Sequence, residues 1–301
     1  MPREVRILPG MFIPKTKASR PPWPIPEKRR SLETGLAEAL GLPVLPGPAP
    51  RIVAFVGAGG KTCALFAAAD SAGSLRTIVT TTTHIRDPRL EPGRRIGPVF
   101  TDIRFSEPPH PGMDPMADLP SPVPGGPPPV LAARTVSEEG KLAGIHPLWV
   151  PRFALGCDLL LLEADGSRGL PVKAPGQNEP VVPPDTDTLV GVIGLDCLGR
   201  PLLAGNAHRP ELLSLRTGCG IGEPFGPGHL VALIRNPEGL FKGCPAGCRR
   251  ILLLNKEDAA DPGLLEDLLE RIRSSEGLAD RVLLGSLTRG RVRSIPDSKR
   301  P

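Results

Sequence analysis

Aromatic residues are scarce in this sequence. Tyrosine is absent, and phenylalanine and tryptophan supply only 3% of the 301 residues. We therefore expect a core built from Leu, Val, Ile and Ala. Long apolar runs are also missing, so no segment is long enough to span a bilayer. The chain after Met1 lacks the pattern of a secretory signal. The sequence predicts a soluble, cytoplasmic protein.

The 6 cysteines are scattered along the chain. Only Cys244 and Cys248 are close, as C-x-x-x-C, and no further ligands stand at a spacing typical of a tetrahedral zinc site. We expect buried thiols rather than a zinc centre or a disulfide framework.

Charge is unevenly placed. Residues 1–50 and 281–301 together hold 14 Lys/Arg and 5 Asp/Glu, whereas residues 51–280 hold 23 and 27. The ends are basic and the middle is mildly acidic. The alkaline pI therefore does not indicate a core that binds nucleic acid, and we expect no nucleic-acid partner.

Proline divides the chain into regions. Residues 1–50 are proline-rich and should be flexible, apart from one short amphipathic helix at Ser31–Leu40. The main domain should cover residues 51–285, with a proline-rich insertion at 106–129, and a basic tail should follow at 286–301.

A buried strand at 51–56 runs directly into a glycine-rich turn and a Lys-Thr pair. Glycine lets backbone N–H groups approach an anion, and a helix that begins near Lys61 adds its positive dipole. Lys61 can reach the β- and γ-phosphates, and the Thr62 hydroxyl can ligate Mg²⁺. The usual first glycine of a P-loop is replaced by Phe55, so the loop is a shortened variant; the alternative is a turn that binds nothing. The predicted nucleotide-binding residues are Gly57, Ala58, Gly59, Gly60, Lys61 and Thr62.

A second apolar strand stops abruptly at two acids. Leu159–Leu162 is followed by Glu163 and Asp165, as in a central parallel strand that delivers a carboxylate to a metal ion or to water. We favour Asp165, with Thr62, as the metal ligand and keep Glu163 as the competitor. An ordinary solvated strand end is the alternative.

A third strand precedes the Asn-Lys-x-Asp spacing that reads guanine. Asp258 can accept hydrogen bonds from N1–H and N2–H₂ of guanine, whereas adenine offers no matching pair of donors. Asn255 would stabilise the loop or contact N7, and the stem of Lys256 would cover the base. A charged loop after a strand is the alternative.

Five blocks of the sequence resemble the YqeC family, whose members are accessory proteins linked to selenium-dependent molybdenum hydroxylases. The likeness runs in order over about residues 31–285. The blocks are VGAGGKT (56–62), TTTTHI (80–85), LLEADGSRGLPVKAPG (161–176), HRPE (208–211) and LNKED (254–258).

The resemblance implies a P-loop NTP-binding maturation factor. Besides the residues above, it points to Arg168, which could clamp a phosphate or neutralise transferred charge. A polar loop with a local salt bridge is the alternative. The candidate catalytic residues are Lys61, Glu163, Asp165 and Arg168. The resemblance adds Thr82, His84, Ser167, Lys173, His208 and Arg209.

We expect a P-loop NTPase-like, three-layer α/β domain with a mostly parallel sheet. The predicted strands lie near 51–56, 76–81, 158–163, 188–194, 250–255 and 281–285. The predicted helices lie near 61–72, 147–155, 208–216, 226–235 and 262–275, and Val130–Ile145 should form a hairpin.

Three functions remain open from the sequence. The first is a maturation factor that hydrolyses GTP or ATP with Mg²⁺ and acts with a selenium-dependent molybdenum hydroxylase or a selenium-delivery protein. The second is a phosphoryl- or nucleotidyl-transferase acting on a small molecule or cofactor. The third is a non-catalytic nucleotide sensor that docks a hydroxylase.

Overall fold

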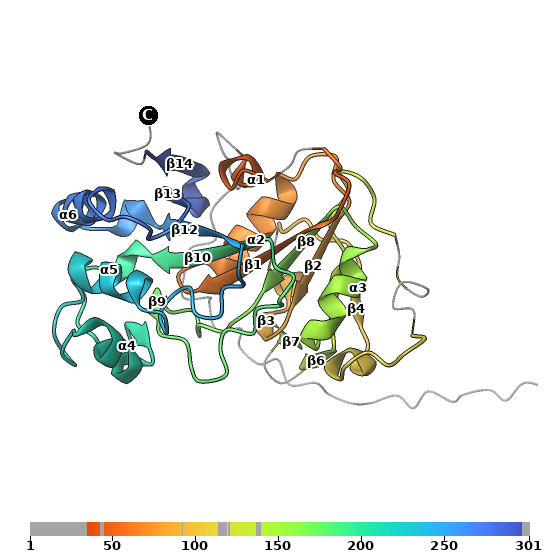
Figure 1. Ribbon diagram of the computed structural model, residues 1–301, viewed down its shortest axis with the longest axis horizontal. Coiled ribbons are helices and arrows are strands. Elements are labelled where there is room, and N and C mark those ends of the chain that lie inside the picture. The colour runs from red at the N-terminus through yellow and green to blue at the C-terminus, as the bar shows by residue number, and fades with distance from the viewer. Residues whose placement is uncertain are drawn as a thin grey trace, which may run out of the picture.

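A nine-stranded, mostly parallel sheet forms the centre of the protein (Figure 1). The computed structural model describes residues 35–42, 45–91, 93–113, 119, 121–136 and 140–296. All six predicted strands are present in this sheet. In spatial order its strands are β14 (Arg291–Ile295), β13 (Arg281–Ser286), β12 (Arg249–Asn255), β10 (Thr188–Gly194), β1 (Arg51–Gly57), β8 (Leu159–Glu163), β2 (Thr77–Thr81), β5 (Val130–Ala132) and β4 (Val99–Thr101).

Alternation along the strands divides the core into two apolar layers. In β1, Val53 and Phe55 pack in one cluster, whereas Ile52, Ala54 and Val56 pack in the other. This period of two is expected for a strand that is buried on both faces. The expected aliphatic core is confirmed. Three of the few aromatic side chains pack together in one layer, with ring centroids 5.0–5.7 Å apart: Phe105, Trp149 and Phe153.

Helices cover both faces of the sheet, so the expected three-layer α/β architecture is present. All five predicted helices form, although each is slightly shorter than expected. One layer of helices packs with Phe55, and the other packs with Ile52. The first layer has α1 (Leu36–Ala39) and α2 (Lys61–Asp70), and the second has α3 (Val150–Ala154), α4 (Pro210–Thr217), α5 (Pro227–Arg235) and α6 (Pro262–Arg273).

The expected hairpin over Val130–Ile145 is wrong in extent. Its first part, β5, pairs in parallel with β2 in the large sheet, because all three of its residues are apolar and buried. Only β6 (Arg134–Val136) and β7 (Lys141–Ala143) form the hairpin, and β3 (His84–Arg86) extends it to three strands.

The basic tail was placed too early. Residues 287–289 form a 3-10 turn, η6, and β14 then pairs antiparallel with β13. Val292 and Ile295 are buried, so two apolar side chains fix a strand in a segment whose charges suggested a tail. In the proline-rich insertion, the described residues from 107 to 129 contain no helix or strand.

Helix α1 is held against the sheet by two arginines. Arg281 donates to the carbonyl of Ala39 at 2.7 Å, and Arg249 donates to that of Leu40 at 2.9 Å. These bonds satisfy carbonyl groups that the end of a helix leaves without partners. The predicted helix began at Ser31, but residues 31–34 lie outside the described residues.

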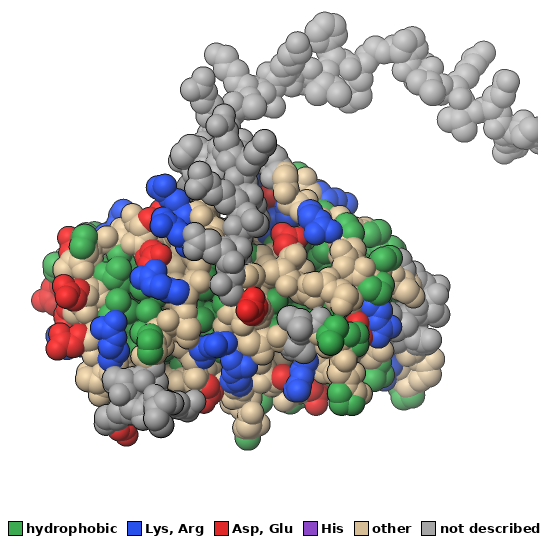
Figure 2. Space-filling model, turned by 90° about the horizontal axis from the view of Figure 1, so that it is seen from above, with side chains coloured by type: hydrophobic (Ala, Val, Ile, Leu, Met, Phe, Trp, Pro, Cys, Tyr) green, Lys and Arg blue, Asp and Glu red, His purple; other side chains and the backbone are tan. Residues whose placement is uncertain are grey.

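The surface carries mixed charge. On the face shown in Figure 2, basic and acidic side chains are interspersed rather than gathered in a single patch. Among the helices of the described chain, none has both the length and the apolar character needed to cross a membrane.

The packing of α1 generates a first prediction. Leu36→Ala should lower the free energy of unfolding by about 2–5 kcal/mol, because Leu36 is fully buried against α2 and the sheet. Leu215→Ala is the matched control, because that leucine is 81% exposed on α4 and should change stability by less than about 0.5 kcal/mol. Urea unfolding measures both. Equal effects of the two substitutions would contradict the packing of α1.

Candidate functional site

The glycine turn joins β1 to α2 at the carboxyl edge of the sheet. Gly57, Gly59 and Gly60 have φ angles of 92°, 81° and 127°, which side chains rarely permit. A Cβ on Gly59 would lie 2.1 Å from the backbone nitrogen of Gly194. The glycines are therefore needed first for close packing of the turn against β10.

Three N–H groups of the turn already have partners inside the protein. Gly57 donates to Oδ2 of Asp165 at 3.1 Å, Ala58 to the carbonyl of Val192 at 2.8 Å, and Gly59 to that of Leu170 at 3.0 Å. The glycine-rich sequence predicted that these groups face an anion. Instead, the backbone donors left for a phosphate are the N–H of Gly60, which has no partner among the described residues, and those of the first turn of α2.

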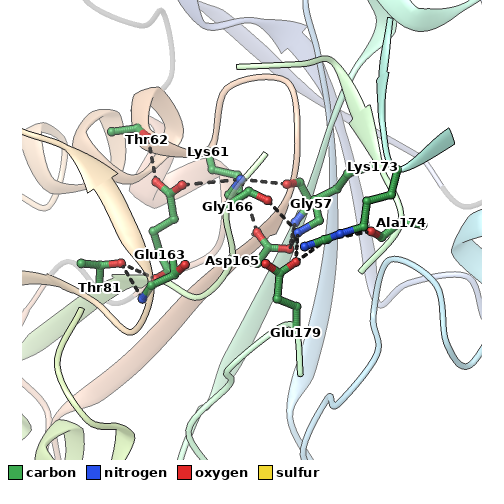
Figure 3. Close-up of polar contacts among 12 residues, drawn as sticks. Gly57, Lys61, Thr62, Thr81, Glu163, Asp165, Gly166, Lys173, Ala174 and Glu179 are labelled. Atoms are coloured by element: carbon green, nitrogen blue, oxygen red, sulfur yellow. Dashed lines mark hydrogen bonds and ion pairs between the residues drawn. The ribbon is translucent and has the colours of Figure 1, made fainter. Parts of the chain in front are cut away.

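Lys61 is buried between two carboxylates (Figure 3). Its Nζ donates to the carbonyl of Gly57 at 2.8 Å and lies 3.3 Å from Oδ1 of Asp165 and 3.5 Å from Oε1 of Glu163. Burial lowers the pKa of Lys61, but Asp165 and Glu163 raise it by more, so the pKa lies above its ordinary value. The ammonium group stays charged at the entrance to α2.

The structure separates the roles of the two carboxylates. Glu163 accepts a hydrogen bond from the hydroxyl of Thr62 at 2.7 Å, and burial raises its pKa. Asp165 is fully buried and is held by Lys61, by the N–H of Gly57 and by Lys173, 3.0 Å from its Oδ2. Two ammonium groups and a backbone donor occupy Asp165, so it suits a metal poorly. Thr62 and Glu163 are therefore the better pair of metal ligands, whereas from the sequence we favoured Asp165 over Glu163.

A magnesium site beside a nucleotide needs only one or two protein ligands. No cluster of three or more His, Cys, Asp or Glu side chains able to hold a metal occurs in the part of the chain that the structure describes. Mg²⁺ in nucleotide sites is often held by one or two protein groups, phosphates and water. Thr62 and Glu163 fit that pattern.

Beyond Asp165, the network continues to α4 (Figure 3). Lys173 donates to the carbonyl of Gly166 and to Glu179, each at 2.7 Å, and Arg209 donates to the same oxygen of Glu179 at 2.6 Å. Sequence reasoning missed Glu179. It stands a few residues beyond the block that carries Lys173, in a proline-rich stretch with no strand to mark it.

Two short strands bring distant predicted residues together. β9 (Val172–Lys173) pairs in parallel with β11 (Ala207–His208), which sets His208 opposite Lys173. Burial and the charges of Arg209, Lys173 and Arg168 lower the pKa of His208 to about 4. The imidazole is therefore neutral at pH 7.

Other predicted residues lie around this network without joining it. The Thr82 hydroxyl donates to the carbonyl of Val181 at 2.7 Å, and His84 is exposed on β3. Ser167 is partly exposed, and Arg168 is exposed in the loop after β8. Arg168 makes no hydrogen bond or ion pair with the described residues.

The predicted base motif meets the glycine turn. Asn255 donates to the carbonyl of Gly59 at 2.8 Å and accepts from the N–H of Leu287 at 3.1 Å. This is the loop-stabilising role considered from the sequence. Lys256, in contrast, pairs with Asp196 at 2.8 Å.

Asp258 is partly exposed and has a basic partner. Its Oδ2 lies 3.2 Å from Nε of Arg289. Burial raises the pKa of Asp258, but hydrogen bonds from Ser286 and Arg289 outweigh it, so the pKa lies below its ordinary value. A guanine would have to displace Arg289, which is itself largely exposed.

Backbone conformation sets three of these residues apart. The non-glycine residues with positive φ in the described chain are Arg168, Arg209 and Lys256, with φ of 52°, 63° and 64°. All three are predicted site residues. Non-glycine residues in this region are uncommon, and they gather at functional sites.

Comparison with known proteins gives a consistent result. The model of the YqeC family, described as "YqeC protein", matches residues 53–211. A protein of Escherichia coli K12 named "Uncharacterized protein YqeC" is 32% identical over 243 residues, covering 79% of this chain and 88% of the relative. No solved structure gives a significant match.

The ion pairs of Glu179 predict a pH dependence of stability. Burial raises the pKa of Glu179, but Arg209 and Lys173 lower it by more, so the pKa is about 2. Because this lies below the value of about 4.3 in an unfolded chain, the pairs stabilise the fold above about pH 4.3, and this contribution is lost as pH falls toward 2.

Glu179→Gln should therefore cost about 1–2 kcal/mol of stability at pH 7, after allowance for solvent screening. The variant should lose part of the acid dependence between these two pKa values. Denaturant unfolding at several pH values measures both effects. Asp267→Asn, in an exposed pair on α6, is the control. A wild-type acid profile in Glu179→Gln would contradict the network.

Proposed function

The chain belongs to the YqeC family, and on that premise we propose that it is a magnesium-dependent, nucleoside triphosphate-binding maturation factor. The observation that carries the proposal is the position of Lys61. A charged lysine is buried at the start of α2, directly after a glycine turn, and its partners are two carboxylates.

Burying Lys61 in this way suits an exchange of partners. A triphosphate at the start of α2 would meet the helix dipole and the N–H groups of its first turn. Lys61 would then transfer part of its interaction from Glu163 and Asp165 to phosphate oxygens. The two carboxylates keep Lys61 charged before a ligand binds.

Magnesium would be held by Thr62 and Glu163, directly or through water. A bound ion would supply positive charge that neutralises the charge of the phosphates. The side chain of Thr62 already points at Glu163, so the two groups are brought together by the fold.

Guanine recognition by Asp258 is the preferred reading of the base motif. Asn255 links this motif to Gly59, which supports placing a base near a triphosphate at α2. The ionised state of Asp258 also favours acceptance of two hydrogen bonds from guanine.

The resemblance supports a role beside selenium-dependent molybdenum hydroxylases. We expect slow hydrolysis by the isolated protein and acceleration by a hydroxylase or a selenium-delivery protein. A catalytic group that such a partner supplies typically accelerates P-loop hydrolases about 10³–10⁵-fold. Phosphate release with and without candidate partners tests the role. Fast turnover of the isolated protein that yields a modified small molecule would favour a transferase.

Lys61→Ala should weaken nucleoside triphosphate binding by about 1.5–3 kcal/mol, which is roughly tenfold to over a hundredfold in Kd, because a charge-assisted phosphate contact is lost. Calorimetry measures the affinity, and thermal unfolding checks that the variant folds. Thr62→Val keeps the shape of the side chain and is the second arm. It should remove the effect of Mg²⁺ on affinity and leave metal-free binding unchanged. Wild-type affinity in Lys61→Ala would rule out the proposed phosphate site.

Asp258→Asn should weaken GTP binding at least about tenfold and improve binding of xanthosine triphosphate, whose C2 carbonyl needs a donor. Arg289→Ala is the control, because it removes the partner of Asp258 but should keep the preference for GTP. Competition binding with GTP, ATP and xanthosine triphosphate measures the ranking. If the wild type binds ATP as tightly as GTP, Asp258 does not read the base.

A further inference from the structure

A group of basic side chains lies on the far side of Asp165 from Lys61. We propose that Arg168, His208 and Arg209 form a subsite for the oxyanion group, phosphate or carboxylate, of a second ligand that binds beside the nucleotide. The nucleotide is the first ligand, and its binding rests on the function proposed above. The subsite itself stands on the arrangement of its own residues.

The two arginines retain capacity to donate hydrogen bonds. Lys173 does not, because its three donors are taken up by Gly166, Glu179 and Asp165. Toward the described residues, Arg209 donates only through Nη1, to Glu179 and the carbonyl of Ala174, so Nε and Nη2 remain. Arg168 is exposed and has no hydrogen-bond partner among the described residues. Lys173 thus positions the acids, and the two arginines are left for a ligand.

Charge around His208 favours an anion. The charged groups that act on it are Arg209, Lys173, Arg168 and Glu179. Three are positive and one is negative, and that one is shared between Lys173 and Arg209. Burial and this excess of positive charge keep the imidazole neutral. A bound oxyanion would offset the excess and accept hydrogen bonds from the arginines.

The backbone supports a built site rather than a chance cluster. Arg168 and Arg209 both have left-handed backbone, in a loop and at the residue before α4, where glycine would be the unstrained choice. The pairing of β9 with β11 fixes His208 beside Lys173. Two separate segments, the loop after β8 and the residues that lead from β11 into α4, therefore supply these side chains.

Asp165 separates the subsite from the proposed phosphate site. Its Oδ1 faces Lys61 and its Oδ2 faces Lys173. Lys61 and Lys173 contact opposite oxygens of Asp165 (Figure 3). A triphosphate at the start of α2 would lie on the Lys61 side, whereas His208 pairs with Lys173 and Arg209 shares Glu179 with it. The shared carboxylate couples the two sites through the charges on both lysines.

The experiment follows the imidazole of His208 by NMR in the full chain. The chain has 5 histidines, so His208→Gln assigns the resonance. The pKa of His208 is measured in chloride, in inorganic phosphate and in acetate at equal ionic strength. Arg168→Gly removes a guanidinium while keeping the left-handed backbone, and Arg271→Ala, an exposed arginine on α6, is the matched control.

We expect phosphate or acetate to raise the pKa of His208 by at least about one pH unit in the wild type and in Arg271→Ala, because a nearby negative charge favours the imidazolium. The rise should be much smaller in Arg168→Gly. The more effective anion identifies the oxyanion class. Thermal unfolding of the same variants with each anion gives a second readout, in which phosphate or acetate should stabilise wild type more than Arg168→Gly.

Three results would overturn the subsite: no rise with either anion, an equal rise in Arg168→Gly, or a rise produced by magnesium nucleotide alone that competes with phosphate. The last would assign the basic group to the nucleotide itself. Failure of the proposed function looks different, because nucleotide binding would then be insensitive to Lys61→Ala while the response of His208 to the anion remained.

Discussion

A single buried carboxylate organises the carboxyl edge of this sheet. Asp165 is fully buried, yet it contacts the N–H of Gly57, the ammonium of Lys61 and the ammonium of Lys173. Burying a charge is costly unless it is paired and hydrogen-bonded. Asp165 therefore depends on both lysines as partners. This requirement ties the glycine turn, α2, β8 and the loop of Lys173 into one unit.

The rest of the edge follows from the same constraint. Lys61 can stay charged only because Asp165 and Glu163 face it, and Glu163 in turn holds Thr62. On the other side, Lys173 draws in Glu179, which draws in Arg209 at the start of α4. Alternating cations and anions thus extend from α2 to α4 without leaving the described fold. A ligand that binds at one end changes the electrostatic balance along the whole chain of charges.

The sequence alone predicted the centre of the fold well. Its strands are apolar runs bounded by glycine or acids, and parallel central strands leave few other ways to bury them, as in β1 and β8. The prediction failed for short strands because their sequence patterns are weak. β14 depends on only Val292 and Ile295 among charged neighbours, and β5 looks like part of a hairpin until its partner strand is known.

The candidate site was predicted less evenly. Lys61, Thr62 and Glu163 follow directly from the ends of strands, so their meeting could be foreseen. Glu179 and Arg289 could not, because their roles come from loops whose partners lie about 30 residues away along the chain. The direction of the glycine N–H groups was also beyond the sequence, since it depends on how closely the turn packs against β10.

The attachment of α1 has a consequence for how the chain assembles during synthesis. The arginines that hold α1 are residues 249 and 281, and β1 lies between β8 and β10, whose residues come more than 100 positions later. β1 therefore meets its two partner strands only after more than 100 further residues have been made. High sequence separation of this kind slows folding and prolongs exposure of apolar strands. β1 gains its neighbours only once residues 159–194 have been made, and the arginines that hold α1 come later still.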